Sequence, residues 1–347
     1  MVTTGKKIKE RGSRASKEKP TTERSIRNVP APRKENLEVV RVKIDEDEAG
    51  QRLDNFLMKR LKGVPKSRIY RIIRGGEVRV NGKRAEVSDH IQKGDEIRIP
   101  PVRVAEKPAS QTDTSTIQTV EFEVLFEDEA LLVINKPSGV AVHGGSGISR
   151  GVIEQLRIQR PKAKFLELVH RLDRETSGVL LVAKKRAALV KLHEMMRANQ
   201  TDKRYFALAI GAWTKQSLHV KAPLHKFLLP DGERRVRVES GGLASHTIFR
   251  LQKKWKDFAL LEAELKTGRT HQIRVHLQHE GHPIAGDDKY GDFALNKQLQ
   301  KQGLKRMFLH AWQMKLAHPI SGEPLVLQAK MPPDLQKFID QLPKNEG

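Results

Sequence analysis

The sequence of 347 residues contains no cysteine and no apolar run of the roughly 18 residues that a membrane-spanning helix needs. The absence of cysteine excludes disulfide bonds and thiolate metal sites. The basic N-terminal segment also lacks the apolar stretch that is typical of a secretory signal. We therefore expect a cytoplasmic protein that does not associate with a membrane.

Acidic residues are far outnumbered by basic ones. The 42 Asp and Glu residues face 65 Lys and Arg residues, which leaves a formal net charge of +23 at pH 7. A field of this sign concentrates polyanions and accelerates their encounter with the protein. Nucleic acid is therefore the leading partner class.

Residues 1–37 have almost no apolar pattern and are rich in Lys, Arg, Ser, Thr and Pro. Such a segment cannot bury enough surface to offset the entropy of ordering, so we predict a disordered basic arm. The arm can serve as a solubilising tail or add nonspecific phosphate contacts, and the composition does not distinguish these roles.

Residues 38–101 have the pattern of a small compact unit. Apolar spacing and turn residues predict strands at 39–44, 78–80 and 94–99 and helices at 49–61 and 67–74. In the second helix Arg68, Arg71 and Arg74 share a face that differs from the isoleucine face. A basic ridge on so small a unit favours phosphate binding over a merely solvated helix.

The segments RLDNFL, GVPKSRIYRIIRGGEVRVNGK and GDEIRI resemble the S4 RNA-binding domain. We therefore expect 38–101 to be an S4 domain whose arginine ridge contacts RNA. Residues 102–118 mix Pro, Ser, Thr and charge without periodicity and are predicted to form a linker.

Residues 119–345 alternate short apolar runs with helical patterns. The predicted strands are 122–126, 131–135, 178–183, 205–210, 259–265 and 325–329, and the predicted helices are 152–160, 186–198 and 271–279. Runs of strands with intervening helices indicate an α+β domain.

Asp173 lies in the segment HRLDRETSG, directly before the apolar strand at 179–182. From the residues alone it has three possible roles: nucleophile, metal ligand, or structural ion-pair partner of Arg171 or Arg174. Local Asp–Arg pairs are common, so the ion pair is the default, and spacing does not decide among the three.

HRLDRETSG, together with NKPSGVAVHGG, KRYFALAIG and TGRTHQIRVHLQHEGHPIAGD, resembles the RluA family of pseudouridine synthases, and the motifs occur in that family's order. The resemblance implies a mixed, largely antiparallel sheet in the catalytic domain. It also implies an isomerisation that needs no cofactor and no metal: uracil is detached from C1′ of the sugar and rejoined through C5.

The family resemblance assigns the catalytic residues. It implies that Asp173 is the nucleophile, that Arg274 is its cationic partner, and that Tyr205 stacks on the target base. From the residues alone, Arg274 can also be a phosphate clamp, a role that does not exclude the first, or simply a surface arginine of a helix. An aromatic such as Tyr205 is usually a core residue. Attack on C1′, attack on C6 and action of the carboxylate as a base all remain open.

The target uridine must leave its stack to be reached. By resemblance Arg171 fills the resulting gap, although a salt bridge to a neighbouring carboxylate is an equal alternative. We also expect Arg174, Arg269 and His143 to contact RNA, with His143 in a glycine-rich loop that either approaches phosphates or simply turns.

Other classes of function are weaker interpretations. His271, His276, His279 and His282 suggest a metal site, but no carboxylate cluster accompanies them. A methyltransferase would need a glycine-rich loop between a strand and a helix, and none is present. A noncatalytic RNA-binding or assembly factor would not need Asp173, Tyr205 and Arg274 together.

Segments LKGVPKS, GEVRVN, GDEIRIPPVRVAE and RMFLHAW fit a branch of the family that acts on the large ribosomal subunit, with Glu175 where Asp is typical. The likeness implies several uridines of 23S rRNA in the large subunit or its precursor as substrate, and a monomeric enzyme. The alternative is a sister branch, also with an S4 domain, that modifies other uridines.

Overall fold

A computed structural model describes residues 38–102, 120–144 and 150–343, apart from residues 47 and 62. The predicted basic arm lies outside the described residues, and so does the predicted linker except for Val102. No helix in the described part of the chain has the length and apolar character needed to cross a membrane.

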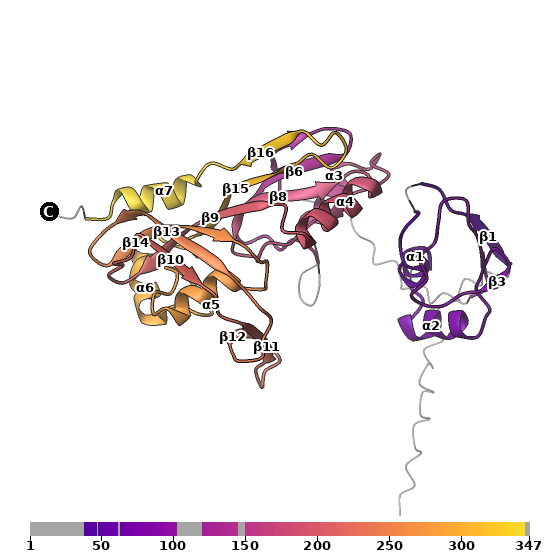
Figure 1. Cartoon of the computed structure of the whole chain (residues 1–347), viewed down its shortest axis with the longest axis horizontal. Coiled ribbons are helices and arrows are strands. Elements are labelled where there is room, and N and C mark those ends of the chain that lie inside the picture. Colours follow the sequence, from indigo (N-terminus) through magenta and orange to yellow (C-terminus); the bar gives the residue numbers. More distant parts are fainter. Residues whose placement is uncertain (1–37, 47, 62, 103–119, 145–149, 344–347) are drawn as a thin grey trace, which may run out of the picture.

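The N-terminal unit packs two short helices on a small antiparallel sheet (Figure 1). Its elements are β1 (Val40–Lys43), α1 (Leu53–Arg60), α2 (Lys66–Arg74), β2 (Arg79–Val80), β3 (Lys83–Arg84) and β4 (Glu96–Ile99), in the sheet order β1-β4-β2-β3. Ile69, Ile72 and Ile73 of α2 are completely buried in its core, as their spacing predicts. Val102, placed by the sequence in the linker, is also buried there.

The start of the first helix in this unit differs from the prediction. The first helix begins at Leu53 rather than Ala49, because Gly50 has a φ of +76° and Arg52 is extended and bridges to His90. The turn between β2 and β3 is as predicted, because Asn81 and Gly82 both have positive φ, the combination that tight hairpins require.

The second unit is built on a ten-stranded sheet, with a separate two-stranded hairpin. Its strands are β5 (Glu123–Glu127), β6 (Leu131–Lys136), β7 (Glu167–Leu168), β8 (Ser177–Ala183), β9 (Asp202–Ile210), β10 (Ser217–Val220), β13 (Thr247–Lys254), β14 (Phe258–Leu265), β15 (Leu309–Ala317) and β16 (Pro324–Gln328), and the hairpin is β11 (Leu224–Leu228) with β12 (Arg234–Val238). The order is β10-β13-β14-β9-β15-β8-β6-β5, with β16 on β15 and β7 on β8.

Helices cover this sheet on both sides. They are α3 (Val152–Gln159), α4 (Arg186–Arg197), α5 (Gln272–His279), α6 (Phe293–Lys301) and α7 (Pro333–Asp340). Alternate residues of β6 and β8 join different cores: Leu132 and Leu180 pack with α3, whereas Val133 and Leu181 pack with Leu192 of α4. Burial on both faces explains why these strands are continuous apolar runs rather than alternating ones.

One parallel pair, β8 with β15, makes the sheet mixed. Gly178 lies at this crossing with a φ of +114°, and a Cβ there would stand 2.1 Å from the carbonyl oxygen of Ala311. Only glycine fits such a close approach. The predicted α+β class with a mixed, largely antiparallel sheet is therefore confirmed.

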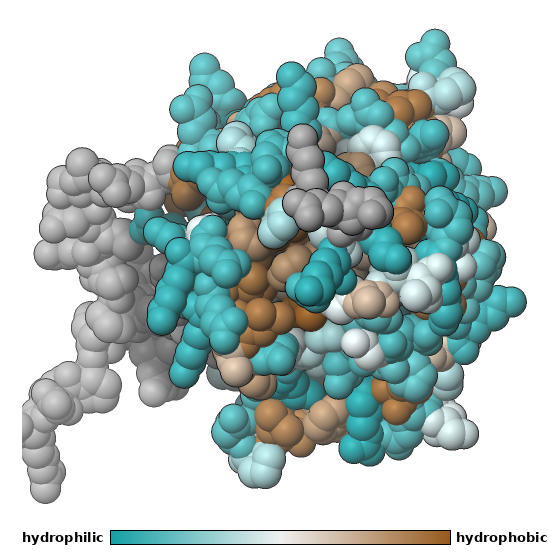
Figure 2. Space-filling view, turned by 90° about the vertical axis from the view of Figure 1, so that its left-hand side faces the viewer, coloured by the Kyte–Doolittle hydropathy of each residue, from teal (hydrophilic) through white to brown (hydrophobic). Residues whose placement is uncertain are grey.

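One end of the second unit is mainly hydrophilic. Figure 2 shows this end, where polar side chains dominate and apolar residues form smaller groups between them. The β11–β12 hairpin projects from the body beside α5 (Figure 1). It is joined to the body by the small cluster of Leu224, Val236 and Val275.

Candidate active site

A cavity of about 930 Å³ opens between the loop that precedes β8 and the segment that leads into α5. Its lining includes Asp173, Tyr205, Arg171, His271 and Arg274. The volume is within the range of pockets that bind small organic groups. The structure thus brings together residues that are about 100 positions apart in the sequence.

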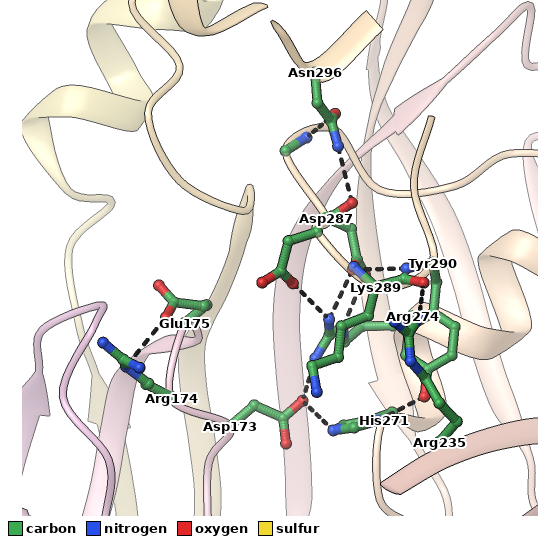
Figure 3. A network of polar contacts seen from close by, with 12 residues as sticks. Asp173, Arg174, Glu175, Arg235, His271, Arg274, Asp287, Lys289, Tyr290 and Asn296 are labelled. Atoms are coloured by element: carbon green, nitrogen blue, oxygen red, sulfur yellow. Dashed lines mark hydrogen bonds and ion pairs between the residues drawn. The ribbon is translucent and has the colours of Figure 1, made fainter. Parts of the chain in front are cut away.

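Arg274 contacts the carboxylates of Asp173 and Asp287, and more distantly, at 3.4 Å, that of the exposed Asp288. Its Nη1 donates to Asp173 Oδ2 at 3.2 Å, and its Nε and Nη2 donate to the two oxygens of Asp287, each at 2.7 Å (Figure 3). The Arg274 side chain is 3% exposed and that of Asp287 is 0% exposed, whereas Asp173 is 28% exposed. The buried pair therefore holds a cation against the one carboxylate that faces the cavity.

Electrostatics keep the buried pair ionised. Burial disfavours the charged form of Arg274, but the hydrogen-bonded Asp287 outweighs burial and raises the pKa of the guanidinium. Burial raises the pKa of the Asp287 carboxyl, but the hydrogen bonds and the charge of Arg274 lower it. The net effect is a lowered pKa. Asp287 also accepts the backbone N–H groups of Lys289 and Tyr290, so its carboxylate is fully used inside the fold.

The ion pair that the sequence suggested for Asp173 has other partners. Among the described residues Asp173 pairs with Arg274 and approaches His271, whose Nε2 is 3.8 Å from Oδ2. Arg174 instead pairs with Glu175 at 3.4 Å and donates from Nε to the carbonyl of Gly139. Figure 3 shows that the Arg174–Glu175 pair lies on the side of Asp173 away from Arg274.

Lys136 holds the loop that carries Asp173. Its side chain is completely buried, and Nζ donates to the carbonyls of Pro137, Val140 and Arg174 at 2.8 to 2.9 Å. Burial lowers the pKa of Lys136 to about 7, while the three carbonyls match the three N–H groups of the charged amine. The NKPSG segment is thus a clamp on the backbone next to the nucleophile candidate.

Tyr205 lies within β9, where it is 8% exposed and lines the cavity. Burial raises the pKa of its hydroxyl, and the charge of Asp173 raises it further. The phenol therefore stays protonated at neutral pH. The sequence suggested either a core residue or a residue of the active site. The structure shows that Tyr205 packs in the core and also borders the cavity.

The predicted RNA-contact residues divide into three groups. Arg171, His143 and Arg269 line the cavity, and Arg171 and Arg269 are exposed. Arg174 does not line the cavity. On α2, Arg71 and Arg74 are exposed and Arg68 is half-buried. The Gly144 N–H beside His143 is already donated to Glu154, so it is not free to bind a phosphate.

The four histidines considered for a metal have separate surroundings. His276 is buried between Ser245, Thr247 and the Ala222 carbonyl, and His282 contacts the Ile210 carbonyl. His279 is exposed. Only His271 lines the cavity, and it contacts Tyr290. The helix begins at Gln272 and not at His271 as predicted, because His271 has a φ of +55°.

Sequence reasoning did not single out three residues of this site, Asp287, Tyr290 and Lys136, and it considered His271 only as a metal ligand. A signal existed for Asp287, because the segment that resembles the family ends on that residue. For Lys136 the signal was a lysine two positions after the apolar run at 131–134 and inside the motif NKPSGVAVHGG. Neither signal names a partner, because the partners follow from the fold: Arg274 is 13 positions from Asp287, and Lys136 contacts carbonyls 1, 4 and 38 positions away.

Two histidines near the site are held neutral. His310 is completely buried, with Nδ1 2.9 Å from Ser177 Oγ and Nε2 3.1 Å from the Ala329 carbonyl. His170, two residues before Leu172, accepts the N–H of Leu181 at 3.2 Å through Nε2. Burial lowers the pKa of each to about 4 from the ordinary value of 6.5.

We expect the free energy of unfolding to decrease as the pH falls from about 6.5 to 4. Over this range His310 takes up a proton in the unfolded chain but stays neutral in the folded protein. Its contribution to stability is therefore complete above about pH 6.5 and is lost as the pH falls toward 4. The shift at His310 corresponds to roughly 3 kcal/mol. Urea denaturation at a series of pH values measures it.

The control for this prediction is His310→Gln, which cannot titrate. Its unfolding free energy should depend less steeply on pH. In the middle of the range the number of protons taken up on unfolding should be smaller by about one than in the unaltered protein. An identical slope in both proteins would show that His310 is not held neutral.

Comparisons with known proteins identify the two units. Residues 130–279 match the RNA pseudouridylate synthase family, and residues 51–97 match the S4 domain. The chain is 53% identical over 309 residues to ribosomal large subunit pseudouridine synthase C of Pasteurella multocida (strain Pm70), covering 88% of this chain and 95% of the relative. It is also 53% identical over 305 residues to the protein of the same name from Escherichia coli (strain K12), covering 87% and 96%.

A solved structure shares the fold. The human RNA pseudouridylate synthase domain containing 4 protein superposes with a TM-score of 0.53 at 28% sequence identity, covering 63% of this chain and 92% of that one. The resemblance drawn from HRLDRETSG and its companion motifs is thus confirmed. The chain belongs to the RNA pseudouridylate synthase family and is an RNA pseudouridine synthase that carries an S4 domain before its catalytic domain.

Proposed function

We propose that this enzyme isomerises several uridines of 23S rRNA to pseudouridine, without a cofactor and with Asp173 as nucleophile. The observation that carries the proposal is the buried Arg274–Asp287 pair, which directs one guanidinium N–H at Asp173, the carboxylate that lines the cavity. The printed names of the relatives support the large ribosomal subunit as the source of the substrate.

The reaction requires a carboxylate that is ionised and held in place. The bond from C1′ to N1 breaks, the bond from C1′ to C5 forms, the hydrogen on C5 leaves as a proton, and N1 gains one. No oxidant, reductant or further group is needed for this balance. Arg274 supplies the fixed positive charge beside Asp173, which favours the ionised form and orients it.

The remaining cavity residues have roles in holding the extruded nucleotide. A uridine must be turned out of its stack, at a cost of a few kcal/mol, before Asp173 can reach its sugar. We assign Tyr205 to stack on the base, Arg171 to steady the gap, and Arg269 and His143 to contact the RNA backbone. Arg174, which points away from the cavity, contacts RNA only outside it.

Release of tritium tests the proposal. Purified protein incubated with unmodified large-subunit rRNA that carries 5-tritiated uridine should release tritium to water, and the modified positions should lie in 23S rRNA. Folded protein that binds this RNA but releases no tritium would instead favour an assembly factor. Mapping pseudouridines in ribosomes from a strain without this gene distinguishes the predicted target set from that of the sister branch.

The arginine ridge of α2 should strengthen RNA binding without taking part in chemistry. We expect the triple variant Arg68→Ser, Arg71→Ser, Arg74→Ser to bind RNA more weakly. A plot of the logarithm of the binding constant against the logarithm of the salt concentration should also be less steep, by about 0.7 to 0.9 for each phosphate contact that is lost. Its single-turnover rate at saturating RNA should be unchanged. Fluorescence anisotropy at several salt concentrations measures the slope.

The matched control removes three exposed lysines from the catalytic domain, Lys297, Lys301 and Lys337, and thus the same charge. If this control loses as much affinity and slope as the α2 variant, the ridge has no special role in RNA binding.

A further inference from the structure

His271 has an unusual backbone for its position. Its φ of +55° is left-handed, and the other described residues other than glycine with positive φ are Asn81 and Asn199. Positive φ is uncommon for any residue other than glycine, although Asn, Asp and His adopt it more often than the rest. His271 stands at the N-cap of α5, yet its side chain caps no helix N–H. The strain is therefore not explained by capping, and strain of this kind is often found at functional sites.

A chain of hydrogen bonds fixes the His271 ring. The backbone N–H of Val236 in β12 donates to the Tyr290 hydroxyl oxygen at 3.0 Å, and that hydroxyl lies 2.7 Å from His271 Nδ1. The backbone N–H of Val236 occupies a lone pair of the Tyr290 oxygen and leaves the hydroxyl proton available for a bond to His271 Nδ1. Nδ1 has no other partner within the described residues. Nδ1 is then an acceptor, and the ring proton of the neutral imidazole is on Nε2.

Burial favours the neutral form of the ring over the charged form. Burial lowers the pKa of His271, and Arg274 and Lys289 lower it further, while Asp173 and Asp287 act in the opposite direction. The net effect is a lowered pKa. His271 is thus a neutral donor whose Nε2–H faces Asp173.

Both donors approach the same oxygen of Asp173. Arg274 Nη1 lies 3.2 Å and His271 Nε2 lies 3.8 Å from Oδ2, and no described residue donates to Oδ1 (Figure 3). The second distance is longer than a hydrogen bond, but such contacts commonly shorten when substrate binds. With Oδ2 held, Oδ1 is the oxygen left to react.

We propose that His271 is a positioning residue of the active site. Its Nε2–H, fixed in one tautomer by Tyr290 and the backbone of β12, holds Oδ2 of Asp173 and so presents Oδ1 to the target nucleotide. This inference rests on the proposed role of Asp173. It also gives the β11–β12 hairpin a role in the active site, because the backbone N–H of Val236 is the first donor in the chain of hydrogen bonds.

The tautomer can be observed without any assay of activity. In protein labelled with ¹⁵N-histidine, long-range proton–nitrogen correlations of His271 should show a protonated Nε2 and an unprotonated Nδ1 at neutral pH. The signals are assigned by their loss in His271→Gln. Tyr290→Phe should weaken the preference for this tautomer. A protonated Nδ1 in the unaltered protein would overturn the proposal.

Kinetics supply the second readout. His271→Leu should lower the single-turnover rate at saturating RNA about tenfold, the value of one hydrogen bond, with little change in RNA affinity. His271→Gln, whose amide can still donate, should recover part of the loss. His279→Leu, at the exposed end of the same helix, is the matched control and should keep the full rate.

The outcomes separate this proposal from the one on which it rests. If Asp173→Asn remains active, the proposed function fails, whatever the tautomer. If Asp173→Asn is inactive but His271→Leu and Tyr290→Phe both keep the full rate, Asp173 is the nucleophile and His271 does not position it. Should His271→Leu fail to fold, Tyr290→Phe and His271→Gln give the same comparison.

Discussion

Replacing Asp173 with Asn should abolish tritium release from 5-tritiated rRNA while RNA affinity stays within about twofold of the unaltered protein. The amide has nearly the shape of the carboxylate but neither attacks the sugar nor accepts a proton at neutral pH. The fold should survive, because Arg274 keeps both 2.7 Å hydrogen bonds to Asp287 and loses only the 3.2 Å contact.

The matched control for this variant is Asp340→Asn, which changes an exposed aspartate on α7. It should release tritium at the normal rate. Anisotropy with the same rRNA fragment, and a thermal unfolding curve, show that the Asp173 variant is folded and binds. Release that persists in Asp173→Asn would mean that another group performs the chemistry.

Replacing Arg274 with Met should both inactivate and destabilise the protein. Asp173 loses its cation, and Asp287, which is 0% exposed, becomes a buried charge without its partner. Breaking a buried pair from one side costs about 3 to 5 kcal/mol. Urea denaturation measures the loss of stability, and tritium release measures the loss of activity.

A double variant separates these two effects. In Arg274→Met, Asp287→Asn the buried charge is gone, while the Asn oxygen can still accept the N–H groups of Lys289 and Tyr290. We expect most of the stability to return and activity to remain absent. If activity returned together with stability, Arg274 would be a structural residue and not the electrostatic partner of Asp173.

The stability deficit of Arg274→Met should also depend on pH. In the unaltered protein Arg274 lowers the pKa of Asp287 against the effect of burial. Without Arg274 only the two backbone N–H groups oppose burial, so the carboxyl takes up a proton at higher pH. The deficit should therefore be smaller at pH 5 than at pH 8.

Much of the secondary structure was predictable from local patterns. The apolar runs at 131–135 and 178–183 are strands β6 and β8, and the arginine-and-isoleucine pattern at 67–74 is helix α2. These predictions succeed because periodicity reports which side of an element is buried. The strand β15 was not predicted, although its RMFLHAW motif was noted, since a motif alone carries no information on strand pairing.

The site was predictable only in part. The resemblance to the family named Asp173, Tyr205 and Arg274, and the structure brings all three to one cavity. The RNA contacts of Arg171 and Arg174 remain predictions, and the structure separates the two, because only Arg171 lines the cavity. Neighbours in sequence can point in opposite directions on a loop, and spacing does not say which faces the substrate.

The sequence by itself determined the chemistry class and the partner class of this protein. Its motifs carry Asp173, the proposed nucleophile, and its charge of +23 indicates nucleic acid. The tertiary structure alone decided that Arg274 is held by Asp287, that Lys136 clamps the catalytic loop, and that His271 turns toward Asp173. The physical reason is that motifs record which groups are present, whereas ion pairs and shared hydrogen bonds depend on distances between segments that only folding brings together.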